Sequence, residues 1–103
     1  MTALRRIVCA ANRLGDRVVL GVRHFDGYMH AQIEALGAAD ERYVPEAWIE
    51  CEQGFIDQFG AFYDRRSAYC VAVLAGQIIR YVGNQTEESV MLGATELYSE
   101  NLY

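Results

Sequence analysis

The sequence predicts an α+β domain in which a small antiparallel sheet carries two helices packed on one face. Three observations lead to this class: a hairpin pattern near the start, two segments with helical spacing or helix caps, and a second hairpin between those helices. With 103 residues and 52% hydrophobic content, the chain is expected to form one globular domain over residues 1–103.

The first half of the chain is predicted to contain a hairpin and a helix. Residues 4–24 alternate loosely around a Leu-Gly-Asp turn, which is typical of two antiparallel strands. Asp26 precedes a segment, residues 28–36, whose apolar residues recur at helical spacing. Gly37 is expected to end this helix.

The second half is predicted to begin with a loop and a second hairpin. Residues 38–47 are polar and contain the only proline, so they are expected to form a surface loop. Residues 48–52 alternate apolar and acidic side chains and predict a half-buried strand leading into a hairpin over residues 53–63. Asp64 is a preferred N-cap, so a helix is expected from there to Gly76.

The remaining residues predict little regular structure. Residues 77–82 are expected to form a short strand or an extended exit from the helix, and residues 83–89 a flexible excursion. An apolar-tipped tail ends the chain. No internal repeat or low-complexity segment is present.

Composition limits the classes of partner. The net charge of -5 disfavours long nucleic acid polymers, because no basic excess is present to release counterions, while small nucleotides remain compatible. No apolar run approaches membrane-spanning length and the first residues lack an apolar leader, so we expect a cytoplasmic protein without a membrane partner. Three widely spaced cysteines favour reduced, buried thiols over disulfides or a zinc site.

Arginines at the start of the second predicted helix are the first candidate binding feature. Arg65 and Arg66 lie where the helix end carries partial positive charge, so two cations there oppose the macrodipole. A bound phosphate would relieve this, because it accepts hydrogen bonds from helix N–H groups and from a guanidinium. The alternative is a solvated helix start with Asp64 screening its neighbours.

All nine basic residues are arginines, which a GC-rich genome would also produce. Several arginines and aromatic residues stand at the ends of predicted elements, where they could hold a charged heterocycle by ion pairing and stacking. These are Arg23, Phe55, Arg65, Arg80, Tyr98 and Tyr103.

Catalytic and metal-binding readings find less support in the residues. His24, Asp26 and His30 could hold a metal in principle, yet His30 and Glu34 read as an ordinary exposed helical pair. His24 could act as an acid or base oriented by Asp26, but no nucleophile motif stands beside it. Walker, GxGxxG, GxSxG and HExxH motifs are absent from the sequence. We therefore expect a binding protein without a catalytic residue, metal or cofactor.

Short blocks of the chain, in order, resemble the phage-encoded Thoeris anti-defence proteins of the first kind. The blocks are residues 21–24 (GVRH), 52–55 (EQGF), 60–62 (GAF) with a helix start at Arg65, 75–78 (AGQI) and 97–102 (LYSENL). The chain departs from the family pattern in two places. Asp64 stands where an uncharged cap would suit a nucleotide better, and residues 83–94 form an insertion before the tail that could move a lid.

The resemblance implies a protein that binds and sequesters immune signalling nucleotides without cleaving them. The ligands would be cyclic ADP-ribose isomers, and in some members also cyclic di- or trinucleotides of CBASS systems. Carried over by block, Arg23 would contact a pyrophosphate, Phe55 and Arg80 would flank the adenine, and Asp64 with Arg65 would lie at the pocket wall. His24, next to Arg23 in the first block, would be a further ligand-binding residue. Tyr98 and Ser99 would belong to a closing tail.

The resemblance also implies symmetric assembly, as a homodimer or homohexamer, with action in the host cytoplasm. Size favours the same assembly, because so small a domain encloses a dinucleotide-sized ligand best by pooling walls from two subunits. Two other functions remain open from the sequence. One is an enzyme that degrades a similar nucleotide with His24 as acid or base, and the other is a phage protein–protein interaction module with an aromatic face.

Overall fold

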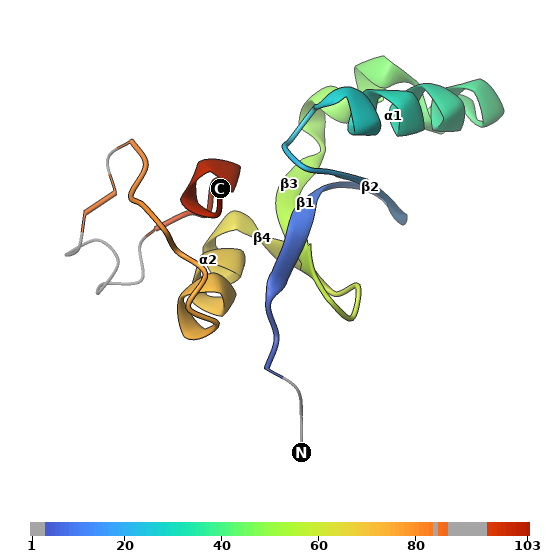
Figure 1. Cartoon of the computed structure of the whole chain (residues 1–103). Helices are drawn as coiled ribbons and strands as arrows, with labels where there is room; N and C mark the ends of the chain where they lie inside the picture. Colours follow the sequence, from blue (N-terminus) through green and yellow to red (C-terminus); the bar gives the residue numbers. More distant parts are fainter. Residues whose placement is uncertain (1–3, 84, 87–94) are drawn as a thin grey trace.

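The structure is a computed structural model that describes residues 4–83, 85, 86 and 95–103. Within them the chain forms an antiparallel sheet with strand order β2-β1-β3-β4 and two α-helices, which confirms the predicted α+β class (Figure 1). The elements are β1 (Ile7–Leu14), β2 (Arg17–Gly21), α1 (Gly27–Ala39), β3 (Glu52–Asp57), β4 (Phe62–Asp64) and α2 (Arg65–Leu74).

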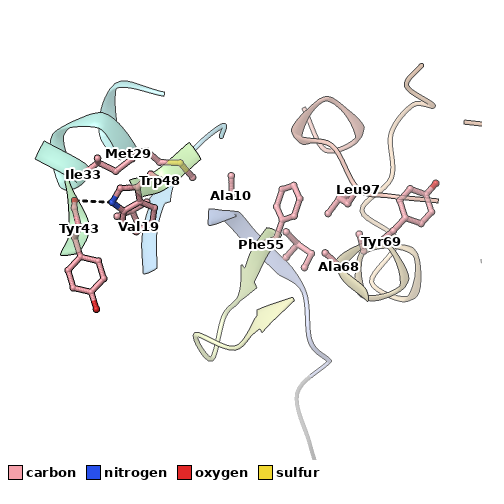
Figure 2. Packing of buried hydrophobic residues seen from close by; sticks show 12 residues of the cluster. Ala10, Val19, Met29, Ile33, Tyr43, Trp48, Phe55, Ala68, Tyr69 and Leu97 are labelled. Carbon is pink, nitrogen blue, oxygen red and sulfur yellow. Dashed lines mark hydrogen bonds between the residues drawn. The ribbon is translucent and has the colours of Figure 1, made fainter. Parts of the chain in front are cut away.

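Both helices pack on the same face of the sheet. Ala10 of β1 pairs with Phe55 of β3 on one side and with Gly21 of β2 on the other. Val19 lies two residues before Gly21 in β2, so its side chain points to the same face as those of Ala10 and Phe55. Figure 2 shows this face filled in two groups, with Met29 of α1 beside Val19 and Ala68 of α2 beside Phe55. The core therefore runs continuously under both helices.

The close approach of β3 and β4 depends on Gly54. A Cβ atom at this position would lie 2.0 Å from the carbonyl oxygen of Tyr63 and 2.8 Å from the ring of Phe62. Any side chain at residue 54 would therefore force the strands apart. This glycine fixes the hairpin that leads directly into α2.

The turn of this hairpin is organised by the buried carboxylate of Asp57. Its Oδ1 accepts hydrogen bonds from the amides of Phe59 and Ala61, while Oδ2 accepts from the hydroxyl of Tyr63 and from Arg5. Burial alone would raise the pKa of Asp57, but these donors together hold the pKa well below its usual range. The carboxylate therefore stays ionised and fully satisfied.

Residues 48–52 do not form the predicted strand. A 3-10 helix (Pro45–Glu50) occupies most of this stretch, and β3 begins only at Glu52. Trp48 is 1% exposed, and its indole nitrogen donates to the carbonyl oxygen of Tyr43 at 3.1 Å. The alternation of apolar and acidic residues is compatible with a strand. However, Pro45 favours the start of a helical turn, and burial of the Trp48 ring stabilises that turn.

Helix starts follow the prediction better than helix ends do. Asp26 and Asp64 are the N-caps of α1 and α2, accepting hydrogen bonds from the amides of Met29 and Ser67. Gly76 follows α2 with φ of +69°, as expected for a helix stop. The prediction that Gly37 ends α1 is wrong, because the helix continues to Ala39.

Residues 77–82 form an extended exit without a strand. The side chain of Gln77 pairs with both backbone polar groups of Ile7, donating to the carbonyl oxygen and accepting from the amide, each at 2.8 Å. The predicted insertion at residues 83–94 lies largely outside the described residues. The prediction of buried thiols is wrong, because Cys70 is exposed and Cys9 and Cys51 are only half-buried. No helix in the described part of the chain could span a membrane.

Candidate functional site

Five of the predicted site residues line one hollow of about 250 Å³, which we call the tail pocket. They come from three distant segments: the loop after β2, the start of α2 and the C-terminal tail. In Figure 1 the C-terminal turn lies between α2 and the end of β2 that leads to α1. The lining residues are Arg23, His24, Arg65, Tyr98, Ser99 and Glu100.

Asp26 builds the loop that carries Arg23 and His24. One carboxylate oxygen accepts from the amides of Val22 and Arg23 at 2.8 and 3.0 Å, and the other accepts from Met29 as the helix cap. A Cβ atom on Gly21 would meet that carboxylate at 2.4 Å, so only glycine permits this turn. The carboxylate of Asp26 therefore fixes the conformation of the loop that begins at Gly21.

Backbone strain lies in this same loop. Phe25 has φ of +55°, the left-handed region that aromatic residues rarely adopt, at a cost of order 1 kcal/mol or more. Its ring packs against the core, which holds the conformation in place. The reversal at Phe25 directs the neighbouring His24 towards β3.

Both ring nitrogens of His24 have partners. Nε2 carries hydrogen and donates to the carbonyl oxygen of Gly54 at 2.7 Å, because a carbonyl can only accept. Nδ1 then accepts from Arg65 Nη2 at 3.4 Å. The ring edge also meets the buried ring of Phe55 at 5.0 Å between centroids. His24 thus links the loop, β3 and α2.

Burial lowers the pKa of His24, and the positive charge of Arg65 lowers it further, against an opposing contribution from the Gly54 carbonyl. The imidazole is therefore neutral near pH 7. With both nitrogens engaged, it has neither a free lone pair to act as a base nor a spare proton to act as an acid. His24 is therefore placed to position the Arg65 guanidinium through its Nδ1 atom.

This histidine should make stability depend on pH. The folded pKa lies below the unfolded value of about 6.5, so its stabilisation is complete above that value and is lost as pH falls towards the folded pKa. Between about pH 7.5 and 5.5 the Tm of the wild type should fall more than that of His24→Gln, whose amide keeps the donor and has no titration. Thermal denaturation at both pH values checks this, and parallel decreases would contradict it.

Arg65 joins α2 to the tail. Nη1 donates to the carbonyl oxygen of Leu97 and Nη2 to Gln53 Oε1, both at 2.8 Å, and the guanidinium lies 4.9 Å from the ring centre of Tyr98. The backbone carbonyl of Arg65 also accepts from the Leu97 amide at 2.8 Å. The guanidinium is thereby held at the N-terminal end of a helix, facing the pocket.

Arg23 joins the loop to the tail from the opposite side. It forms an ion pair with Glu100 at 2.8 Å, and its guanidinium lies 5.3 Å from the ring centre of Tyr103. The Tyr103 hydroxyl donates to the carbonyl oxygen of Val22. Glu100 was not among the predicted site residues, and no local signal could have revealed it, since 77 residues separate it from Arg23.

The other three predicted site residues lie elsewhere. Phe55 is 0% exposed and reaches the tail pocket only through the edge of His24, so its ring is not available for stacking on a ligand. Asp64 caps α2 and lines a neighbouring hollow of about 450 Å³, which shares Arg65 with the tail pocket. Arg80 lines a separate groove and does not border the tail pocket.

The carboxylates of Asp64 and Asp26 have structural roles as helix caps. The amide of Ser67 chiefly lowers the pKa of Asp64, which keeps this cap ionised at the helix start. Both oxygens of Asp26 are occupied by backbone amides. Among the described residues, no three His, Cys, Asp or Glu side chains are grouped so that they could hold a metal ion.

Comparisons with known proteins give one match. The model of a family described as phage T4 y16D protein matches residues 6–103, which is nearly the whole chain. No curated protein and no solved structure matches. The match covers every residue of the tail pocket.

Proposed function

This chain belongs to the phage T4 y16D protein family, and we propose that it is a phage anti-defence protein which binds cyclic nucleotide signals and holds them uncleaved. The proposed ligands are cyclic ADP-ribose isomers, with CBASS cyclic di- and trinucleotides as further members of the class. The observation that carries the proposal is the convergence of two arginines and a tyrosine from distant segments on the tail pocket.

The electrostatics of the tail pocket favour a phosphate-bearing ligand. The ion pair between Arg23 and Glu100 is about half exposed on both sides, and such pairs contribute about 0–1 kcal/mol. A phosphate could replace the carboxylate and form bidentate bonds with the Arg23 guanidinium. Arg65 uses one of the two hydrogens of Nη1 on Leu97, which leaves the other for a ligand.

The environment of His24 favours binding over cleavage. Its two nitrogens are engaged with Gly54 and Arg65, and its lowered pKa keeps it neutral. A general acid or base needs an exchangeable proton or lone pair within reach of the ligand. We therefore assign His24 the role of holding Arg65 in place beneath the ligand.

Size favours a site completed by a second copy. Small-molecule pockets usually enclose about 300–1,000 Å³, whereas the tail pocket encloses about 250 Å³ and shares Arg65 with the neighbouring hollow. We propose a symmetric homodimer, or a homohexamer built from such dimers, in which a partner subunit supplies the missing wall. Its proposed place of action is the host cytoplasm, where the signal is present.

The first test is binding followed by recovery of the ligand. Calorimetric titration with cyclic ADP-ribose isomers should give saturable binding, and heat denaturation of the complex should release the isomer intact on chromatography. Native mass spectrometry of the same complex should give an even number of subunits carrying nucleotide. Degraded nucleotide after release would contradict sequestration, and absence of binding to every isomer and cyclic di- or trinucleotide would overturn the proposal.

Substitutions at the Arg23–Glu100 pair separate the alternatives. Arg23→Ala should weaken binding by about 1.5–3 kcal/mol for a lost charged hydrogen bond, whereas Glu100→Gln should strengthen it by removing the competing carboxylate. Arg42→Ala is the matched control, because Arg42 is an exposed arginine paired with Asp40 away from the pocket. A silent Arg23→Ala would instead favour a protein–protein interaction module.

A further inference from the structure

A third hollow lies against α2, apart from the tail pocket. It has a volume of about 400 Å³ and runs between α2 and the extended residues that follow it. Three of its large apolar side chains are well exposed: Val73 at 43%, Ile79 at 58% and Tyr81 at 52%. We call it the α2 groove, and its lining residues are Tyr69, Val73, Gly76, Ile78, Ile79, Arg80 and Tyr81.

Val73, Ile79 and Tyr81 lie along one hollow of the surface. Single exposed apolar residues need no explanation, but a contiguous apolar hollow marks a place where something binds. The volume lies within the range of small-molecule pockets. The groove shares no lining residue with the tail pocket, so the two are independent features.

The hydroxyl of Tyr69 is the feature that points to a ligand. Tyr69 is 3% exposed, and its buried oxygen has no hydrogen-bond partner among the described residues. In Figure 2 the hydroxyl end of the ring points away from Ala68 and Leu97, towards the outside of the cluster. An unpaired buried hydroxyl costs roughly 1–3 kcal/mol, so an acceptor arriving through the groove would be stabilised.

The protonation state of Tyr69 defines what it can bind. Burial raises the pKa of the phenol, and the neighbouring Tyr81 raises it further. The hydroxyl therefore keeps its proton and can donate to an acceptor oxygen. Tyr69 is one of the residues that line the groove.

Arg80 supplies the positive charge of the groove. It is exposed, and among the described residues no carboxylate pairs with its guanidinium. Its backbone carbonyl accepts from Asn101 Nδ2 at 2.8 Å, which fixes the start of the side chain beside the groove.

We propose that the α2 groove is a second binding site, which takes a small organic anion with an apolar or aromatic body. The body packs on Val73, Ile79 and Tyr81, the negative group pairs with Arg80, and an acceptor oxygen takes the hydrogen bond of Tyr69. This site stands independently of the function proposed for the tail pocket. The proposed ligand is therefore an amphipathic anion.

The test uses a defined pair of probes, 4-phenylbutyrate and its neutral counterpart 4-phenylbutanamide. Titrations followed by NMR of the ¹⁵N-labelled protein should place the carboxylate at residues 69–81, with about tenfold tighter binding than the amide, the size of one charge-assisted bond. Equal affinity for both probes, or shifts confined to other residues, would overturn the proposal.

Variants assign the binding to the two polar groups. Arg80→Gln should bind the carboxylate no better than the amide, while Tyr69→Phe should lose about threefold or more in affinity for the carboxylate. Free Tyr69→Phe should keep or raise its Tm, because it removes an unsatisfied buried oxygen. Arg42→Gln and Tyr28→Phe, both exposed and outside the groove lining, are the matched controls.

The affinities of these variants and of Arg23→Ala for the carboxylate decide whether the α2 groove is the binding site. Wild-type affinity for the carboxylate in Tyr69→Phe and in Arg80→Gln would overturn the proposal. Arg23→Ala should bind the carboxylate as the wild type does, because Arg23 lies outside the groove. A failure of the tail-pocket proposal therefore leaves this result unchanged, and the two can be told apart.

Discussion

Replacement of Phe55 by alanine is expected to lower the free energy of unfolding by about 3–5 kcal/mol, the range for removal of a fully buried aromatic ring. Phe55 is 0% exposed, and two of its neighbours, Ala10 of β1 and Ala68 of α2, are alanines whose side chains are too small to fill the cavity. Chemical denaturation followed by circular dichroism measures the change. A small domain should lose about 4–8 °C of Tm per kcal/mol.

The matched variant for this position is Phe55→Leu. It retains much of the buried volume, so it should cost far less stability and keep ligand affinity close to that of the wild type. If the Phe55 ring stacks on the ligand instead, Phe55→Leu should lose ligand affinity although its stability changes little. That outcome would show that the buried placement of Phe55 does not describe the ligand-bound protein.

Arg65→Ala is expected to have the largest effect on ligand binding, at least 1.5–3 kcal/mol for one charged hydrogen bond to a phosphate. The loss should exceed that of Arg23→Ala, because Arg65 also holds Leu97, Gln53 and His24. Removing it withdraws the ligand contact and loosens the tail at once. Calorimetric titration with the bound isomer measures the affinity, with Arg42→Ala as control.

The loosening of the tail has its own readout. In Arg65→Ala the amides of residues 97–103 should exchange hydrogen faster, since the tail loses a link to α2, while amides of the β1–β3 pairing stay protected. Arg65→Lys should restore charge without the planar fork and recover only part of both properties. Unchanged exchange of the tail in Arg65→Ala would contradict the proposed link.

The candidate site was predictable in part. Arginines and aromatic residues at element ends, together with the ordered blocks, predicted five residues that the structure brings to one pocket. The same reasoning also placed Phe55 in the ligand site, whereas its side chain is buried in the core. Nothing in the local sequence distinguishes Phe55, buried inside the core, from Phe59 on the adjoining turn, which is 59% exposed.

The sequence determined the local structure of this protein wherever a short-range interaction decides it. The aspartate caps before both helices act within three residues, and the two hairpins follow from alternation around a turn. Trp48 marks the limit of such reasoning, because its alternating neighbours fit a strand as well as a helical turn. Only its burial beneath α1 settles the choice.

Tertiary structure alone decided the chemistry of the surface. The partner of Arg23 is 77 residues away, and Arg65 reaches a carbonyl 32 residues later, so both pairings depend on the path of the whole chain. The same holds for the hydroxyl of Tyr69, which has no partner within the described part of the chain and whose burial the sequence does not reveal. Local patterns fix backbone conformation over a few residues, whereas burial and charge pairing arise from contacts that form only when distant elements pack.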